Sequence, residues 1–319
     1  MMTRRARAAA VPAPLIAALG LIASIALTAC GSSAQGTSTG RLPVVASFYP
    51  LQFAAEQIGG GHLAVKSLTK PGAEPHDIEL TTQDVASVSE ARLVIYEQGL
   101  QGAVDKAVET QAGDHSLNVA PAAKLDLRFQ PTVGAAAESS GENAPGSTDP
   151  HFWLDPQRYS DVAKAIATKL ASTDPAHKAD YQQNAKAFEG KLTALSQEFT
   201  TGLASCKRRD IVTSHAAFGY LAERFDMQQI AINGLSPHEE PNAAKLGAIS
   251  TYAKAHQVTT IYAETLASPA IAQTVAKEAG ARLATLDPIE GLTSQSRGKD
   301  YFEVMRSNLK ALQSGQGCT

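Results

Sequence analysis

The chain has 319 residues, 44% of them hydrophobic, and its 28 Lys and Arg against 31 Asp and Glu give a formal net charge of −3. This balance argues against nucleic acid or a polybasic membrane contact, because both draw on an excess of positive charge. A length above roughly 250 residues favours division into two domains. We therefore expect two lobes.

The first 29 residues have the pattern of an export signal. Arg4, Arg5 and Arg7 precede an uncharged, largely apolar run from Ala8 to Ala29, which is the order of a signal peptide. Because this run of 22 residues is about as long as the roughly 20 that span a bilayer, an uncleaved anchor helix is the alternative. Removal of residues 1–29 changes the formal charge from −3 to −6, since the segment carries three arginines and no acidic residue.

A cysteine follows this segment directly. "LTAC", Leu27 to Cys30, resembles the bacterial lipobox, in which cleavage leaves a lipid-carrying cysteine at the new N-terminus. The small and polar residues after it, "GSSAQGTSTG", suit a flexible tether, so residues 30–41 are predicted to be a lipidated linker. The expected location is the outer face of the cytoplasmic membrane, with Cys30 as the membrane anchor.

Two further cysteines, Cys206 and Cys318, remain in the chain. Disulfides persist outside the cytoplasm, so we predict that these two are bonded; two free thiols are the alternative. The bond would tie the C-terminus to its own lobe, and no cysteine would be left as a nucleophile or a soft metal ligand.

Residues 42–173 alternate short β-rich runs with helical ones. "LPVVASF", "HLAVKSL" and "ARLVIY" predict buried strands at 42–48, 62–68 and 91–96, and helices are expected near 51–58, 82–89 and 102–110. This alternation is typical of a parallel α/β lobe. Residues 130–149 are rich in small residues, Pro and Gly and lack periodicity, so a flexible surface loop is predicted there.

Residues 174–204 predict one long linking helix. Thr173 or Asp174 can cap its first turn and Pro175 suits its start. Apolar residues recur along one face at spacings of 4, 3 and 4, namely Phe188, Leu192, Leu195 and Phe199. A helix from Pro175 to Leu203 is roughly 43 Å long, enough to span two lobes as a stiff spine.

The α/β alternation resumes over residues 205–319. Strands are predicted at 210–213, 228–232, 258–262 and 282–286, and helices near 216–225, 242–256, 269–279 and 299–312. A second α/β lobe follows, similar to the first in pattern but without a close sequence repeat.

Four polar residues lie at predicted strand ends or in the loops beyond them, where open α/β sheets bind ligands. They are His76 in "KPGAEPHDIEL", His151 in "TDPHFWLDP", His215 after "DIVTS" and Asp287 after "ARLATL". Three imidazoles and one carboxylate suit tetrahedral Zn²⁺, and their wide separation excludes a zinc finger. Singly, each has an ordinary alternative as a solvated loop side chain, a helix cap, a buried group or a turn residue.

The surroundings of these residues add two candidates. The pairs Asp149-Pro150 and Asp155-Pro156 stiffen the backbone around His151, and Trp153 can form part of an apolar wall beside it. Glu264 after "TTIYA" either supports a ligand imidazole from behind or caps the helix that begins near Ser268.

Six motifs in succession resemble one family. "PGAEPHDIEL", "DPHFWLDP", "TSHAAFGYLAERF", "GLSPHEEP", "YAE" and "LDPIEGL" follow one another as in the metal-binding lipoproteins of ABC importers, the cluster A-I or ZnuA/TroA type. The resemblance runs from about Leu42 to the C-terminus. It implies two Rossmann-like α/β lobes with parallel sheets joined by one long rigid helix. It also implies a metal in the interlobe cleft, bound by His76, His151 and His215 with Asp287 in the fourth position.

The resemblance implies a monomeric receptor that captures one Zn²⁺ per chain and presents it to a membrane permease powered by a cytoplasmic ATPase, without catalysis. Manganese members of the family carry a carboxylate at the third ligand position, whereas His215 favours zinc; a manganese receptor is the alternative. Less favoured alternatives are an adhesin-type lipoprotein and an exported zinc hydrolase, which would need an open coordination position. Many zinc members carry a histidine-rich run that residues 130–149 lack.

Overall fold

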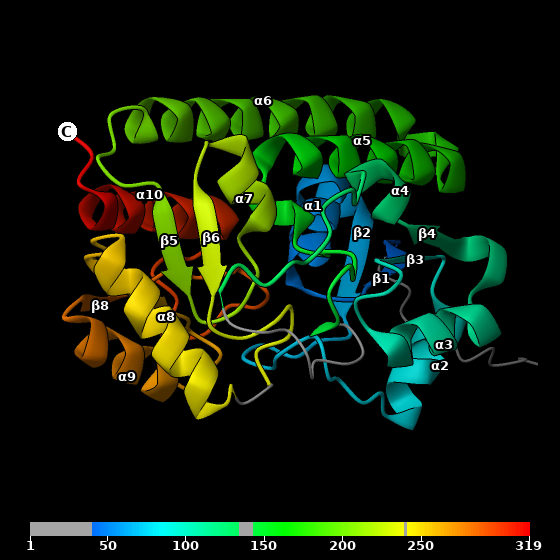
Figure 1. Cartoon of the computed structure of the whole chain (residues 1–319). Coiled ribbons are helices and arrows are strands. Elements are labelled where there is room, and N and C mark those ends of the chain that lie inside the picture. Colours follow the sequence, from blue (N-terminus) through cyan, green and yellow to red (C-terminus); the bar gives the residue numbers. More distant parts are fainter. Residues whose placement is uncertain (1–39, 134–142, 239–240) are drawn as a thin grey trace, which may run out of the picture. The chain divides into compact units, whose positions relative to one another are not determined.

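Two parallel four-stranded sheets organise the chain in the computed structural model, which describes residues 40–133, 143–238 and 241–319 (Figure 1). The predicted signal peptide, Cys30 and nearly all of the predicted linker lie outside the described residues, as does the 134–142 part of the predicted loop. None of the helices within the described ranges combines the length and the apolar character needed to cross a membrane.

The first sheet has the order β2-β1-β3-β4 and every neighbouring pair is parallel. Its strands are β1 (Leu42–Ala46), β2 (Leu63–Ser67), β3 (Leu93–Tyr96) and β4 (Ser116–Asn118). The helices α1 (Tyr49–Gly59), α2 (Thr82–Glu90) and α3 (Gly102–Gln111) connect them. Buried apolar side chains from both faces of β1 and β3 form the core of this lobe, as expected for a sheet covered on both sides. The predicted strands and helices of this lobe are confirmed.

The second sheet repeats this arrangement with the order β6-β5-β7-β8, again all parallel. Its strands are β5 (Asp210–Thr213), β6 (Gln228–Ala231), β7 (Thr260–Ala263) and β8 (Arg282–Thr285). The helices α7 (Gly219–Arg224), α8 (Ala243–Ala255), α9 (Ala270–Ala279) and α10 (Tyr301–Gln316) accompany them. The structure bonds Cys206 to Cys318, as predicted, so the end of the chain is fixed beside the start of this lobe.

One long helix follows the first lobe and leads into the second. The helix α5 (Pro156–Thr173) is followed by a single turn at Pro175–His177 and by α6 (Lys178–Leu203), whose 26 residues extend about 39 Å. α6 packs against α1 and α5 of the first lobe and α10 of the second, and runs along both lobes at the top of Figure 1. The apolar residues predicted to share one face of this helix are all buried, namely Phe188, Leu192, Leu195 and Phe199.

An ion pair adds a rigid contact between the lobes. Asp155 caps α5 by accepting a hydrogen bond from the Gln157 N–H at 2.9 Å. The same carboxylate binds the Arg224 guanidinium of α7 through two bonds of 3.0 and 2.9 Å. Because the carboxylate is buried and the contact is bidentate, the pair fixes α5 against the second lobe.

Candidate metal centre

Four buried side chains converge where the loops of the two sheets meet. His76 lies in the β2–α2 loop, His151 directly before the one-turn helix η4 (Phe152–Leu154), His215 two residues after β5 and Glu290 in the β8–α10 loop. Each offers one ligand atom, and these atoms all lie within 4.8 Å of one another. We call these four residues the inner group. Two of its members come from each lobe.

The inner group is arranged around one carboxylate oxygen. Glu290 Oε1 lies 3.6 Å from His76 Nε2, 3.3 Å from His151 Nε2 and 3.2 Å from His215 Nε2. Three imidazole nitrogens and one carboxylate oxygen form a donor set that tetrahedral Zn²⁺ takes in proteins.

Burial and neighbouring charges shift the pKa values of Glu290 and His215 in the inner group. Burial opposes ionisation of Glu290, but the neighbouring imidazoles, His215 foremost, outweigh it and hold the pKa of this carboxyl well below its usual range. Burial likewise opposes protonation of His215, yet Glu264 and then Glu290 raise its pKa well above the ordinary histidine value. The protein therefore keeps an ionised carboxylate among imidazoles without exposing it to water.

A second carboxylate fixes each of two imidazoles from behind. Glu264 Oε2 lies 2.6 Å from His215 Nδ1, and its Oε1 accepts the His215 backbone N–H at 2.9 Å. In the other lobe, Asp149 Oδ1 lies 2.8 Å from His151 Nδ1 and accepts the His151 backbone N–H at 2.9 Å. A carboxylate on Nδ1 holds the proton there and leaves Nε2 as the donor atom that faces a metal.

The structure corrects the fourth position. It does not bring Asp287 into the inner group; Glu290, three residues further on, lies there instead. The Asp287 Oδ1 atom accepts the Ile289 backbone N–H at 2.8 Å, and Asn308 holds the Asp287 backbone on both sides. Ile289 has φ of 58°, a left-handed conformation that is costly for a β-branched residue. This turn directs Glu290 inward while Asp287 stabilises it.

Trp153 contacts both His151 and the loop that carries Glu290, which is more than the apolar shielding predicted for it. Its ring centroid lies 5.3 Å from that of His151, and its Nε1–H donates to the Pro288 carbonyl at 2.7 Å. Trp153 belongs to the first lobe and Pro288 to the loop that carries Glu290. The indole therefore shields the inner group and also fixes the Glu290 loop across the lobe boundary. Glu264 lies on His215 rather than at the start of α9, where Pro269 takes the capping position without a side-chain bond.

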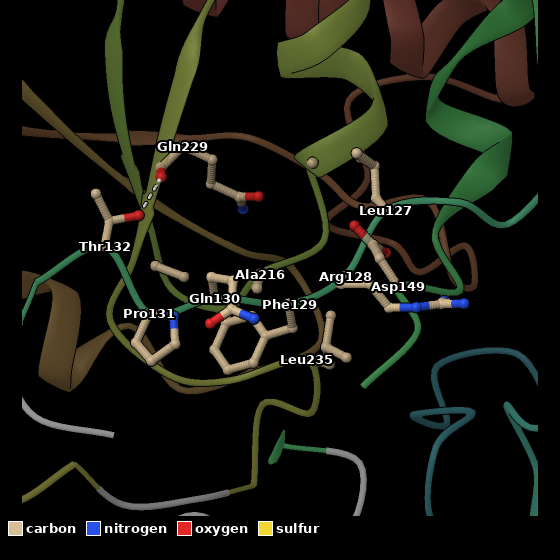
Figure 2. A pocket seen from close by; sticks show the side chains of 12 residues that line it. Leu127, Arg128, Phe129, Gln130, Pro131, Thr132, Asp149, Ala216, Gln229 and Leu235 are labelled. Carbon is tan, nitrogen blue, oxygen red and sulfur yellow. Dashed lines mark hydrogen bonds between the residues drawn. The ribbon is translucent and has the colours of Figure 1, made fainter. Parts of the chain in front are cut away.

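A separate cavity of about 160 Å³ lies beside Asp149 (Figure 2). Residues 127–132 line one side of it, and the Thr132 hydroxyl donates to the Gln229 carbonyl of β6 at 3.2 Å, the dashed line in the figure. None of the inner group lines this cavity. Its one carboxylate among the described lining residues is Asp149, which is already bonded to His151, so it offers no second set of ligands.

Comparison with known proteins identifies the family. A family model described as the periplasmic component A of the zinc-uptake complex, ZnuA, matches residues 44–315. The chain belongs to the ZnuA family. It is 34% identical over 298 residues to the high-affinity zinc uptake system protein ZnuA of Bacillus subtilis, covering 90% of this chain and 92% of that protein. It is 35% identical over 303 residues to the zinc-binding lipoprotein AdcA of Streptococcus pneumoniae. That match covers 92% of this chain but 59% of AdcA, so the chain spans little more than half of that relative.

Solved structures of similar proteins have the same fold. The Zn(II)-bound ZnuA-like domain of Streptococcus pneumoniae AdcA superposes with a TM-score of 0.71 at 34% identity, over 87% of this chain and 99% of that domain. The laminin-binding protein Lmb of Streptococcus agalactiae, described as bifunctional with adhesin and metal-transporting activity, superposes with a TM-score of 0.73 at 31% identity, over 86% and 99%. These similarities confirm the predicted two-lobed fold and the predicted family.

Sequence reasoning missed Glu290 and Asp149 as members of the site. Glu290 stands within the motif "LDPIEGL", but the rule that ligands lie at strand ends favours Asp287, which directly follows the predicted strand at 282–286. The Asp149-Pro150 pair by itself indicates only a stiff backbone. The spacing Asp-x-His was the available signal, since a carboxylate two residues before a histidine can reach both its N–H and its Nδ1.

Proposed function

We propose that this chain is an extracytoplasmic zinc receptor, which captures one Zn²⁺ per chain and delivers it to an ABC permease driven by a cytoplasmic ATPase. The observation that carries the proposal is the inner group: three imidazoles and one carboxylate, all buried, with Nδ1 of two imidazoles held by further carboxylates. Relatives that are named for zinc binding and zinc uptake support the same metal.

The ligands that we propose are His76, His151, His215 and Glu290, with Glu264, Asp149 and Trp153 positioning them. Four protein ligands fill a tetrahedral shell, whereas catalytic zinc keeps one position for water. This favours a carrier over a hydrolase. Three imidazoles also favour Zn²⁺ over Mn²⁺, which prefers harder oxygen ligands.

The test is a competition titration of the full chain in detergent, with a chromophoric chelator, against Zn²⁺ and then Mn²⁺. We expect tight one-to-one zinc binding and weak manganese binding. His215→Ala should lose tight zinc binding, whereas the control His256→Ala, an exposed histidine paired with Asp210 at 2.8 Å, should retain it. Absence of a tight zinc site, a preference for manganese, or equal effects of the two substitutions would refute the proposal.

We further propose that residues 42–173 and 205–319 act as the two lobes around a linking segment 174–204, that the receptor is monomeric, and that lipid on Cys30 retains it at the membrane. Lipoprotein relatives support the anchor. Cys30→Ser should release the chain from the membrane fraction without changing its zinc affinity. Continued membrane retention would favour the uncleaved anchor helix.

A further inference from the structure

One short helix of the second lobe contacts the segment of the first lobe that carries His151. The helix α7 starts shortly after the ligand His215. Besides the ion pair of Arg224 described above, its first two residues, Gly219 and Tyr220, contact the residue pair that precedes His151. α7 therefore touches the surroundings of one ligand and follows closely on another.

The lack of a side chain at Gly219 leaves room for the Asp149 carboxylate. A methyl group on the Gly219 Cα would overlap Asp149 Oδ2. The other oxygen of this carboxylate, Oδ1, lies 2.8 Å from His151 Nδ1. The backbone of Gly219 is outside the left-handed region, so its conformation would also suit a larger residue. The contact with Asp149, rather than backbone freedom, is what requires glycine here.

Tyr220 holds the backbone of Asp149. Its buried hydroxyl donates to the Asp149 carbonyl at 3.0 Å and accepts the Leu127 N–H at 3.4 Å. The Arg158 Cζ atom of α5 lies 4.3 Å from the centroid of the Tyr220 ring, within cation–π distance. Because its ring is held against α5, the hydroxyl fixes Asp149 in place relative to the second lobe.

The cavity of about 160 Å³ beside Asp149 gives its carboxylate a place to move (Figure 2). Asp149 and Gly219 both line this cavity. A carboxylate displaced by a methyl group at Gly219 is the end of a short side chain and can turn into this space. Gly219→Ala should therefore break the bond to His151 and leave the fold intact.

We propose that Gly219 and Tyr220 are positioning residues for zinc binding, which hold Asp149 against His151 from the second lobe. This rests on the proposed function, because it concerns a ligand of the same zinc ion. The geometry of a first-lobe ligand then depends on the contact between the lobes. Movement of α7 away from the first lobe would loosen the carboxylate behind His151 and lower the zinc affinity.

The first experiment compares two glycine substitutions on the full chain in detergent, by chelator competition for Zn²⁺ beside urea unfolding without zinc. Gly219→Ala should bind zinc about 10- to 100-fold more weakly, as when a group that orients a ligand imidazole is removed. Gly247→Ala is the matched control, because Gly247 also lies in a helix of the second lobe and a methyl group there would meet no atom within 4 Å. It should bind zinc as the unchanged protein does. Equal zinc affinities of the two variants would overturn the proposal.

A double substitution tests whether Gly219 acts through Asp149. Asp149→Ala removes the carboxylate and so leaves room for a methyl group at Gly219. In that background Gly219→Ala should cost no further zinc affinity, because substitutions of residues in contact are not additive. If the two losses instead multiplied, Gly219 would affect the site by another route and the proposal would fail.

Tyr220→Phe provides a second test, which also decides the matter if Gly219→Ala does not fold. It keeps the ring beside Arg158 and removes one neutral hydrogen bond, so we expect a loss of zinc affinity of at most about tenfold. Tyr252→Phe is the control, since the Tyr252 hydroxyl donates to Asp210 at 2.9 Å and not to the inner group or its partners. A Tyr220→Phe protein that binds zinc as tightly as Tyr252→Phe would contradict the proposal.

The position of the His151 proton gives a readout without zinc. Nitrogen-15 NMR of the histidine-labelled, zinc-free chain reports which ring nitrogen carries the proton. We expect Nδ1 in the unchanged protein and in Gly247→Ala, and a proton shared between Nδ1 and Nε2 in Gly219→Ala. The same proton position in all three proteins would refute the role of Gly219.

The outcomes also separate this proposal from the receptor function. Tight zinc binding that neither Gly219→Ala nor Tyr220→Phe weakens would refute the positioning role and leave the receptor function intact. Absence of a tight zinc site from the unchanged protein would instead refute the receptor function itself.

Discussion

Glu264→Gln tests how much the carboxylate behind His215 contributes to zinc affinity. The substitution keeps the size of the side chain and removes its charge. Glu264 is buried and bonds both the Nδ1 and the backbone N–H of His215, at 2.6 and 2.9 Å. A glutamine offers one acceptor oxygen, so at most one of these bonds persists with full strength, and the negative charge that favours the proton on Nδ1 is lost.

The expected loss of zinc affinity can be estimated from other carboxylates that orient a ligand imidazole. Removal of a carboxylate that orients a ligand imidazole typically weakens metal binding about 10- to 100-fold, which is about 1.4 to 2.7 kcal/mol. We expect Glu264→Gln to fall in this range. Glu278→Gln is the matched control, because Glu278 also accepts a hydrogen bond from a neighbouring side chain, Ser250 at 3.0 Å, but does not contact the inner group.

The assay is chelator competition for zinc, run beside urea unfolding in zinc-free buffer so that folding losses are measured separately. Glu264→Gln should lose zinc affinity beyond any loss of folding free energy, and Glu278→Gln should retain it. If Glu264→Gln bound zinc as tightly as the unchanged protein, the carboxylate would not orient His215 and our explanation of the site would fail.

Three further predictions concern pH, the disulfide and the tryptophan. Burial, followed by the charge of Asp149, raises the pKa of Glu97 well above its usual value of 4.5, so the folded chain keeps a proton that the unfolded chain releases. Stability should therefore fall as pH rises above about 4.5, by up to about 1.4 kcal/mol per pH unit; urea unfolding at pH 5 and 8 should show a smaller fall for Glu97→Gln, and equal falls would contradict this. Replacing both Cys206 and Cys318 by Ala opens a 112-residue loop and should lower the free energy of unfolding by up to about 4.7 kcal/mol at unchanged zinc affinity; an unchanged urea midpoint would disprove it. Zinc should change Trp153 emission and saturate at one equivalent, because the indole lies beside His151; tight binding by chelator competition without an emission change would exclude the indole as a reporter.

The pattern of apolar residues in the sequence was sufficient to predict most of the strands and helices. Buried β-rich runs and the apolar stripe of residues 188–199 predicted the strands and α6, because core packing enforces those patterns. α5 was not predicted, although Asp155 before Pro156 and apolar residues at helical spacing from Tyr159 to Leu170 carried the signal. β4 has three residues, too few for any alternation to show.

Members of the inner group could be predicted from the sequence only where they lie just after a predicted strand. His215 comes two residues after β5, so its place at the sheet edge follows from the strand itself. The choice between Asp287 and Glu290 depends on the left-handed backbone at Ile289, which β-branched residues rarely adopt and which no sequence pattern indicated. The contact of Tyr220 with Asp149 joins residues 71 positions apart and depends on how the two lobes meet.

The four donors of the inner group come from loops spread over residues 76–290, so an unfolded or half-folded chain has no zinc site. Zinc at about 100 times its dissociation constant would add about 2.7 kcal/mol to the free energy of unfolding. A chain without zinc should consequently unfold more readily, and proteases cut unfolded chains. The lifetime of the chain would then depend on zinc supply, with scarce metal shortening it even at constant synthesis.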